Sequence, residues 1–235
     1  MVIPAHNEER YLPTGLAAIE VAAEVLGEPV EVVVVANRCT DATAALAEAW
    51  GAVVVEDDAR SIGAVRNAGA AVASGELLVT VDADCRVAPG SLRAASVLLD
   101  SGVVVGGGSR IVPERRSPGI VATYAVMELL VGASRLAGGM FWCRRDDFDA
   151  VGGFDADLLV GEDLDFARRL RAHGRRSGRR FMKIRSAPVE ASCRKFDQFG
   201  DWHMFAMAAQ LGQIARAARG VDTTWVDRYF FDFND

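Results

Sequence analysis

The chain has 235 residues, of which 51% are hydrophobic and 25% are charged, and its formal net charge is -6 at pH 7. This hydrophobic content excludes an intrinsically disordered chain, and the length suits one α/β domain rather than several independent modules. The acidic balance, with a pI near 5.2, argues against nucleic-acid binding, because contact with a phosphate backbone needs a positively charged surface.

Short Val-rich runs alternate with longer Ala-rich stretches of helical period along the chain, a pattern that predicts parallel strands joined by crossover helices. The predicted fold class is therefore α/β. A first strand is expected to end at Pro4. Further strands are expected, in chain order, at residues 30–35, 52–56, 77–81, 103–105, 140–143, 181–184 and 189–191. Helices are expected at residues 8–26, 40–50, 61–73, 89–99, 120–136, 162–172 and 197–218.

The cysteine spacing and the first residues bear on where the protein acts. Four cysteines without a Cys-x-x-Cys pair indicate neither a zinc site nor a disulfide framework. The chain opens on Val2-Ile3-Pro4 with no basic and apolar leader, which predicts a cytoplasmic protein. The apolar window 120–142 is interrupted by Glu128 and Arg135 and falls short of a spanning helix. Peripheral contact with a membrane surface stays open.

The strand expected at residues 77–81 runs directly into Asp82-Ala83-Asp84. Ligands of open α/β sheets bind outside the carboxyl ends of the strands. Two carboxylates one residue apart can share a hard cation such as Mg²⁺ or Mn²⁺, and substrate phosphates usually complete the shell of such an ion. Asp is also common in capped turns where strands end, so this motif alone does not decide between the two interpretations.

A second acidic group, Gly161-Glu162-Asp163-Leu164-Asp165, opens an expected helix. The helix dipole favours acidic residues in a first turn, which would account for all three carboxylates. Transfer of a group to a hydroxyl, however, needs a carboxylate or similar base that takes the acceptor proton. Glu162 and Asp163 differ by about 100° around a helix, so we expect only one of them to face a cleft.

Three further polar segments follow expected strands or begin expected helices. A nucleoside could lie over the turn in residues 2–9, where Pro4 is followed by Ala5-His6-Asn7-Glu8. In residues 36–43, Thr40 or Asp41 could equally be an ordinary helix N-cap. In residues 63–69, Arg66 could serve the base or the phosphates of a nucleotide, or be an exposed helix arginine.

Taken together, these segments resemble glycosyltransferase family 2, the inverting enzymes with a GT-A fold, over roughly residues 1–175. The matching elements are VIPAHNEE (Val2–Glu9), TDAT (Thr40–Thr43), ARSIGAVRNAG (Ala59–Gly69), VDAD (Val81–Asp84) and VGGFD with GED (Val151–Asp163). The resemblance implies a mostly parallel central sheet with helices on both faces. It also implies a nucleotide-sugar donor-binding half in residues 1–109 and an acceptor-binding half of the same domain in residues 110–235.

The resemblance also implies roles for individual residues. Asp82 and Asp84 would bind the divalent cation, Mn²⁺ or Mg²⁺, and Asp163 would be the catalytic base. The family usually carries two acidic residues before its Gly-Ser-Thr-Asp turn, where this chain has Ala36 and Asn37. A UDP-sugar is the first choice of donor and a GDP-sugar the second. Donor contacts are expected from Pro4, Ala5, Asn7, Glu8, Asn37, Arg66, Asp82 and Ala83.

Other contacts to the diphosphate or the acceptor are expected from Glu162, Trp142, Arg194 and His203. Trp142 could stack on a sugar ring or pack in the core, and His203 could equally be a packed or surface histidine. The basic segment 168–185 is expected to be a solvated face, with anionic lipid or a phosphorylated acceptor as the alternative. The sequence does not identify the acceptor, which could be a glycan, a lipid-linked sugar or a small molecule.

Other classes of protein fit the sequence less well. A sugar-nucleotide pyrophosphorylase would carry a Gly-rich loop where this chain has Ala5-His6-Asn7-Glu8, and an aspartyl phosphatase would continue with a small turn where it has Cys85-Arg86. A nicotinamide dehydrogenase needs Gly-x-Gly-x-x-Gly, which residues 106–108 do not supply. A non-catalytic sugar-nucleotide binding module is the remaining alternative, and the joint presence of Asp82, Asp84 and Asp163 argues against it.

Overall fold

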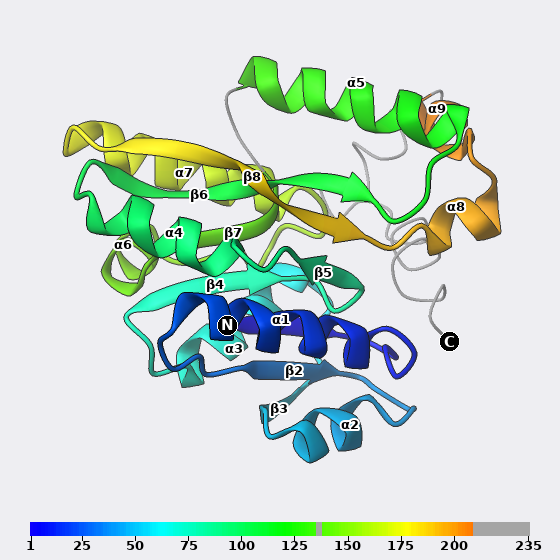
Figure 1. Ribbon diagram of the computed structural model, residues 1–235, viewed down its shortest axis with the longest axis horizontal. Coiled ribbons are helices and arrows are strands. Elements are labelled where there is room, and N and C mark those ends of the chain that lie inside the picture. The colour runs from blue at the N-terminus through cyan, green and yellow to red at the C-terminus, as the bar shows by residue number, and fades with distance from the viewer. Residues whose placement is uncertain (135–137, 209–235) are drawn as a thin grey trace.

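The computed structural model describes residues 1–134 and 138–208. Within these residues, eight strands form one sheet in the order β3-β2-β1-β4-β7-β6-β8-β5, with helices on both of its faces (Figure 1). Strands β3, β2, β1 and β4 run parallel, as do β6 and β8. Strand β7 is antiparallel to both neighbours, and β5 is antiparallel to β8. The predicted α/β class, with a mostly parallel sheet, is confirmed.

The strands are β1 (Val2–Ala5), β2 (Val33–Asn37), β3 (Val53–Asp57), β4 (Leu77–Val81), β5 (Cys85–Val87), β6 (Val104–Pro113), β7 (Gly138–Arg144) and β8 (Arg180–Ala191). The helices are α1 (Leu12–Leu26), α2 (Thr43–Trp50), α3 (Ile62–Val72), α4 (Ser91–Asp100), α5 (Pro118–Ser134), α6 (Arg145–Ala150), α7 (Glu162–Arg176), α8 (Arg194–Phe199) and α9 (His203–Ala208). Most expected elements are therefore present, with boundaries shifted by a few residues.

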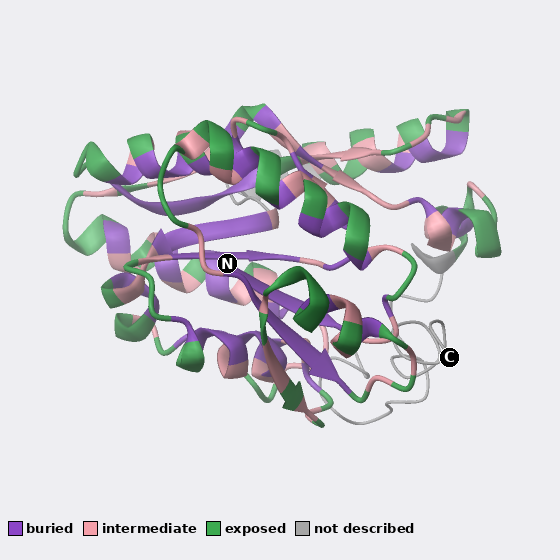
Figure 2. Ribbon diagram, turned by 60° about the horizontal axis from the view of Figure 1, so that its bottom comes forward, coloured by how far each residue is buried: buried purple, intermediate pink, exposed green. Residues whose placement is uncertain are grey.

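Two hydrophobic layers sandwich the sheet, which is why its central strands are apolar on both sides. Side chains of α1, α2 and α4 pack on one face and include Leu16 and Leu99. Side chains of α3, α6 and α7 pack on the other and include Phe166. Val34 belongs to the first layer and Val35 to the second, as the two-residue period of a strand requires. In Figure 2 the strands are accordingly largely buried, while the outer faces of the helices are exposed.

The second half of the chain departs most from the predicted elements. Residues 180–191 form one continuous strand rather than two, and β6 extends to Pro113 rather than ending at residue 105. Glycines in β6 permit close packing there: a Cβ atom on Gly107 would lie 1.8 Å from the Met182 carbonyl oxygen and 2.6 Å from the Trp142 ring. Strand β5 and helix α6 were not predicted.

The expected last helix, 197–218, is divided. Helix α8 ends at Phe199, Gly200 adopts a left-handed φ of 89°, and α9 begins at His203. A left-handed residue cannot continue an α-helix, and glycine adopts that conformation without steric cost. Residues 209–218 of the expected helix lie outside the described residues.

Helix α5 is apolar around most of its circumference. It exposes Val121, Val126, Met127 and Leu129, the last to 72% of its surface, and lies along one margin of the molecule (Figure 1). Among the described residues, no helix is both long enough and apolar enough to cross a bilayer.

Candidate active site

The loops that follow β1 and β2 are joined to each other by hydrogen bonds. The Asn7 side-chain oxygen accepts from the Thr40 backbone N–H at 2.8 Å, and the Glu8 backbone N–H donates to the Thr43 hydroxyl at 2.7 Å. Asn7 adopts a left-handed φ of 50° to do so, which Asn tolerates better than most residues. The polar segments in residues 2–9 and 36–43 therefore form one continuous edge at the carboxyl ends of β1 and β2.

Asn37 ends β2 and is buried. Its side-chain amide donates to the Asp57 carboxylate at 3.1 Å and to the Ala59 carbonyl at 2.9 Å. Asp57 lies opposite Asn37 in the parallel pair of β2 and β3. A carboxylate of the neighbouring strand therefore lies beside Asn37, where the chain itself has no acidic residue at positions 36 and 37. In the sequence, the acidic pair at residues 57–58, directly after the strand expected at 52–56, is the signal that could have indicated this partner of Asn37.

Arg66 is a buried residue of α3, so the alternative of an exposed helix arginine is wrong. Its guanidinium donates to Asp82 and to Glu162, each at 2.8 Å, and lies 5.2 Å from the centre of the Phe154 ring. Ion pairs with a bidentate, planar guanidinium have well-defined geometry. Arg66 therefore holds the carboxyl end of β4 against the first turn of α7.

The two neighbouring acids at the start of α7 have different surroundings. Glu162 is buried against Arg66, whereas Asp163 is partly exposed and accepts from the Leu164 backbone N–H at 2.7 Å. Burial raises the pKa of Asp163 above its ordinary value, Arg66 opposes that rise, and Asp82 adds to it. Burial likewise raises the pKa of Glu162, again opposed by Arg66. Asp163 thus lies within electrostatic reach of Asp82.

Asp165, the third acid of this turn, pairs with two arginines of its own helix. Asp165 accepts from Arg169 at 2.5 Å and from Arg168 at 3.3 Å, the i,i+4 and i,i+3 pairs that stabilise helices. Of the three carboxylates in the first turn of α7, Asp163 is therefore the one that combines partial exposure with proximity to Asp82.

Asp84 directly precedes β5, whose antiparallel pairing with β8 sets Cys85 opposite Ala191. The chain that leaves β8 consequently passes over Asp84, and Arg194 lies there. Its guanidinium forms two hydrogen bonds with the Glu8 carboxylate, at 2.6 and 2.8 Å, and lies 3.1 Å from Asp84. Arg194 of α8 thus contacts both Glu8, in the turn after β1, and Asp84 of the Asp-x-Asp motif.

The charged side chains of Glu8, Asp84 and Arg194 are largely removed from water. Burial raises the pKa of Glu8 to about 7, with Arg194 acting in the opposite direction, and burial also raises the pKa of Asp84. Lys195 lies within electrostatic reach of Asp84, Asp82 and Glu8, and burial lowers its pKa to about 8. Arg194 was expected from the sequence to contact the diphosphate or the acceptor, and its contacts with the Glu8 and Asp84 carboxylates were not expected.

The carboxylates outnumber the cationic side chains in this region. The acids are Glu8, Asp82, Asp84, Glu162 and Asp163, and the cations are Arg66, Arg194 and Lys195. Five carboxylates stand beside three cationic side chains, and carboxylate oxygens are the ligands that Mg²⁺ and Mn²⁺ prefer. The described residues contain no group of three or more His, Cys, Asp or Glu arranged as a metal site. The residues present therefore fit an ion held by one or two carboxylates together with phosphate and water.

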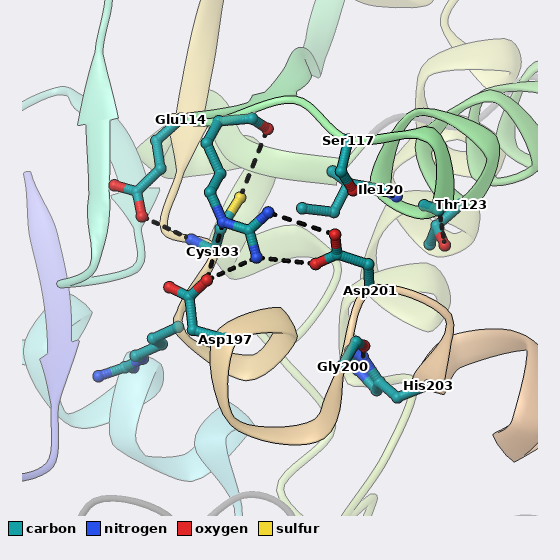
Figure 3. Close-up of polar contacts among 12 residues, drawn as sticks. Glu114, Ser117, Ile120, Thr123, Cys193, Asp197, Gly200, Asp201 and His203 are labelled. Atoms are coloured by element: carbon teal, nitrogen blue, oxygen red, sulfur yellow. Dashed lines mark hydrogen bonds and ion pairs between the residues drawn. The ribbon is translucent and has the colours of Figure 1, made fainter.

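Several expected contact residues are buried. Trp142 is 1% exposed and packs within the core, so the core interpretation is correct and its ring presents no face to a sugar. Pro4, Ala5 and Ala83 are also buried. His203 is buried beside Phe196, with ring centres 4.8 Å apart, and its Nδ1 bonds to the Gly200 carbonyl at 2.8 Å (Figure 3).

Comparison with known proteins shows which family this chain resembles in sequence and in fold. The family model described as "Glycosyl transferase family 2" matches residues 1–152. Uncharacterized glycosyltransferases of Mycobacterium bovis and Mycobacterium tuberculosis are each 35% identical over 102 residues. These alignments cover 43% of this chain and 44% of each relative, so they span less than half the length of the relatives.

Two solved structures share the fold at low sequence identity. TarS of S. aureus (residues 1–349, in complex with UDP-GlcNAc) is 19% identical, with a TM-score of 0.62 over 81% of this chain and 57% of that one. Glucosyl-3-phosphoglycerate synthase of Mycobacterium tuberculosis, in complex with Mn²⁺ and UDP-glucose, is 21% identical, with a TM-score of 0.61 over 94% and 78%. These likenesses confirm the expected GT-A fold. The family model matches more than half of this chain, and the chain therefore belongs to glycosyl transferase family 2.

Proposed function

We propose that the protein transfers a sugar, with inversion, from a nucleotide diphosphate donor to an acceptor hydroxyl, and that it uses a divalent metal ion. The observation that carries the proposal is the arrangement around Arg66, whose ion pairs join Asp82 to Glu162 and thereby bring Asp163 within electrostatic reach of Asp82. An Asp-x-Asp motif and a second carboxylate, that of Asp163, at the same end of the sheet support this proposal, since a metal-assisted transfer needs both a metal-binding group and a base.

The donor is proposed to be a UDP-sugar, with a GDP-sugar as the second choice. The nucleoside would lie over the edge formed by the turns after β1 and β2, near Asn7, Glu8 and Asn37. Support comes from the structural likeness to TarS, crystallised with UDP-GlcNAc, and to glucosyl-3-phosphoglycerate synthase, crystallised with UDP-glucose and Mn²⁺. The amide of Asn37 is already engaged by Asp57 and Ala59, so these partners orient it.

Asp84 and Asp82 would hold the divalent cation together with the donor diphosphate. When bound, such an ion stabilises the charge that develops on the leaving diphosphate. Asp163 would take the proton from the acceptor hydroxyl as the new bond to the sugar forms. Its raised pKa makes the carboxylate a stronger base. Glu162, fixed by Arg66, would help to orient the first turn of α7.

Residues 110–235 would form the acceptor side and residues 1–109 the donor side of the one domain. The acceptor remains a glycan, a lipid-linked sugar or a small molecule. A screen of acceptor hydroxyls with the best donor identifies it. Binding of UDP-sugars without hydrolysis or transfer would instead support a non-catalytic module. Formation of a sugar 1-phosphate from UDP-sugar and pyrophosphate would support a pyrophosphorylase.

The metal role is tested by calorimetric titration of UDP into the wild type and Asp84→Ala, each with and without Mn²⁺. For the wild type we expect Mn²⁺ to raise UDP affinity at least about tenfold, because charge pairs at protein surfaces interact by several kcal/mol before screening. Asp84→Ala should lose most of this increase.

The matched control is Asp100→Asn, an aspartate whose side chain is 64% exposed and pairs with Arg144 at the amino end of β4. It should behave like the wild type. Equal UDP affinity in all four titrations of wild type and Asp84→Ala would contradict the metal role.

We also propose that the protein contacts the surface of anionic membranes through α5. Leu129, Val121 and Met127 are exposed on this helix, and Arg185, which pairs with Glu128 of α5 at 3.3 Å, has a largely exposed side chain beside them. Exposed apolar surfaces are typical of protein or membrane contact sites, and a basic side chain at the rim is attracted to anionic headgroups. The exposed apolar surface would then be buried among the lipids.

Vesicle co-sedimentation tests this contact. Leu129→Asn should lower binding to phosphatidylserine-containing vesicles about tenfold or more, because burying a leucine side chain contributes roughly 1.5–3 kcal/mol. Val97→Asn, which changes a residue of α4 that is 61% exposed, is the control and should bind as the wild type does. No binding by the wild type, or equal loss in both variants, would count against α5.

A further inference from the structure

The short strand β5 determines what lies over the Asp-x-Asp motif. The Ser192 backbone N–H donates to the Asp84 carbonyl at 3.2 Å, which continues the β5–β8 pairing by one step beyond Ala191. Arg194 follows two residues later as the first residue of α8. The backbone that carries Arg194 is therefore hydrogen-bonded directly to the backbone of Asp84.

A second set of contacts anchors α8 from the other side (Figure 3). The Glu114 carboxylate accepts from the Cys193 backbone N–H at 2.9 Å. Arg115 donates to Asp197, in α8, at 2.8 Å and to Asp201 at 2.7 Å. These contacts join the segment between β6 and α5 to both ends of α8. The backbone at the start of α8 is thus held from two sides, by Asp84 and by Glu114.

The Arg194 guanidinium binds two carboxylates at once. Both of its terminal nitrogens bond to Glu8, and one of them also lies 3.1 Å from Asp84. The Tyr11 ring lies 4.9 Å from the same guanidinium, a distance at which a cation is attracted to an aromatic face. Glu8 and Tyr11 can retain the arginine when its contact with Asp84 is lost.

We propose, on the basis of the function proposed above, that Arg194 is exchanged between Asp84 and the donor diphosphate, so that the cation and the nucleotide bind cooperatively. Asp84, when it holds a divalent cation, would no longer attract the guanidinium, because the two positive charges would repel each other and both would need the Asp84 carboxylate. A diphosphate offers the displaced guanidinium new acceptors, since the arginine fork fits phosphate as well as carboxylate. Binding of the cation would therefore release Arg194 for the diphosphate, and binding of the diphosphate would release Asp84 for the cation.

The proposal predicts opposite effects of one substitution on two affinities. Arg194→Gln removes the competitor, so Mn²⁺ alone should bind about fivefold tighter or more, the lower end of typical coupling between sites. The same substitution removes a phosphate contact, so UDP in saturating Mn²⁺ should bind about fivefold weaker or more. Calorimetry of Mn²⁺ alone, and of UDP with and without Mn²⁺, measures both effects and the coupling between the ligands.

Two further variants provide a control and a second test of the exchange. Arg168→Gln, which changes an arginine with a 78% exposed side chain, should leave every affinity unchanged. Arg194→Lys keeps a positive charge beside Glu8 but lacks the fork that reaches two carboxylates. It should therefore also bind Mn²⁺ alone more tightly than the wild type, and it carries the test if Arg194→Gln does not fold.

The outcomes separate this inference from the proposed function. If wild-type UDP binding depends on Mn²⁺ but both Arg194 variants bind Mn²⁺ alone no more tightly than the wild type, the exchange is refuted and the proposed function stands. If the wild type binds neither Mn²⁺ nor UDP, the proposed function fails and the inference falls with it.

Discussion

Asp163→Asn should lower the rate of sugar transfer by about 10²- to 10⁴-fold, the usual contribution of a general base. An acceptor hydroxyl is a poor nucleophile until its proton begins to leave, and Asn has the shape of Asp without its basicity. Mn²⁺-dependent UDP binding should stay nearly intact, because Asp163 is proposed to act on the acceptor and not on the donor. Steady-state transfer kinetics and UDP calorimetry on the same preparation measure the two effects separately.

The neighbouring acids provide the controls. Asp165→Asn removes a carboxylate from the same helical turn whose partners are Arg168 and Arg169, and it should transfer at close to the wild-type rate. If Asp163→Asn is as active as the wild type while Glu162→Gln is inactive, the base is Glu162 and our assignment within this pair is wrong.

Arg66→Met should lower the free energy of unfolding by about 3–5 kcal/mol, the usual effect of removing one partner of a buried ion pair. The substitution leaves Glu162, which is 7% exposed, as a buried carboxylate without its cation, and it also frees Asp82. Urea denaturation followed by circular dichroism measures the change. The size of the effect follows from the unpaired charge more than from the lost packing, because Met nearly fills the same volume.

A double-variant comparison tests that explanation. Arg66→Met combined with Glu162→Gln removes the buried charge together with its partner, so it should be more stable than Arg66→Met alone. Arg168→Met, at an exposed position of α7, should change stability by less than about 0.5 kcal/mol. A loss below about 1 kcal/mol for Arg66→Met would show that the ion pairs around it contribute little.

Local patterns predicted the elements whose causes are local. Strand β4, a run of five apolar or β-branched residues with its Asp-x-Asp motif directly after it, has the expected boundaries. Helix α1 begins four residues later than expected, because Pro13 has no N–H to donate to the Glu9 carbonyl and residues 7–9 are bonded to the next loop. That loop partner lies more than thirty residues away, so a short sequence window does not reveal it.

Besides the short helix α6, the features that were missed depend on distant contacts. Strand β5 has three residues, and its pairing with β8 spans more than a hundred positions. The contact of Arg194 with Glu8 joins residues 186 positions apart. Asp57 beside Asn37 depends on the register of two neighbouring strands. The sequence therefore supplied the chemically important residue types, while the specific partners of Arg66, Asn37 and Arg194 depended on the three-dimensional pairing of strands.

The hydrogen bonds between the turns after β1 and β2 bear on the entropy of ligand binding. Asn7, Glu8 and Glu9 each bond across to the segment Thr40–Thr43, so this edge is already ordered in the structure described. Ordering a flexible backbone costs roughly 1–2 kcal/mol per residue. A nucleoside that binds over a preorganised edge avoids that entropic loss. More of its interaction energy would then remain as affinity, and discrimination between bases would come from fixed polar groups rather than from loops that change conformation with each ligand.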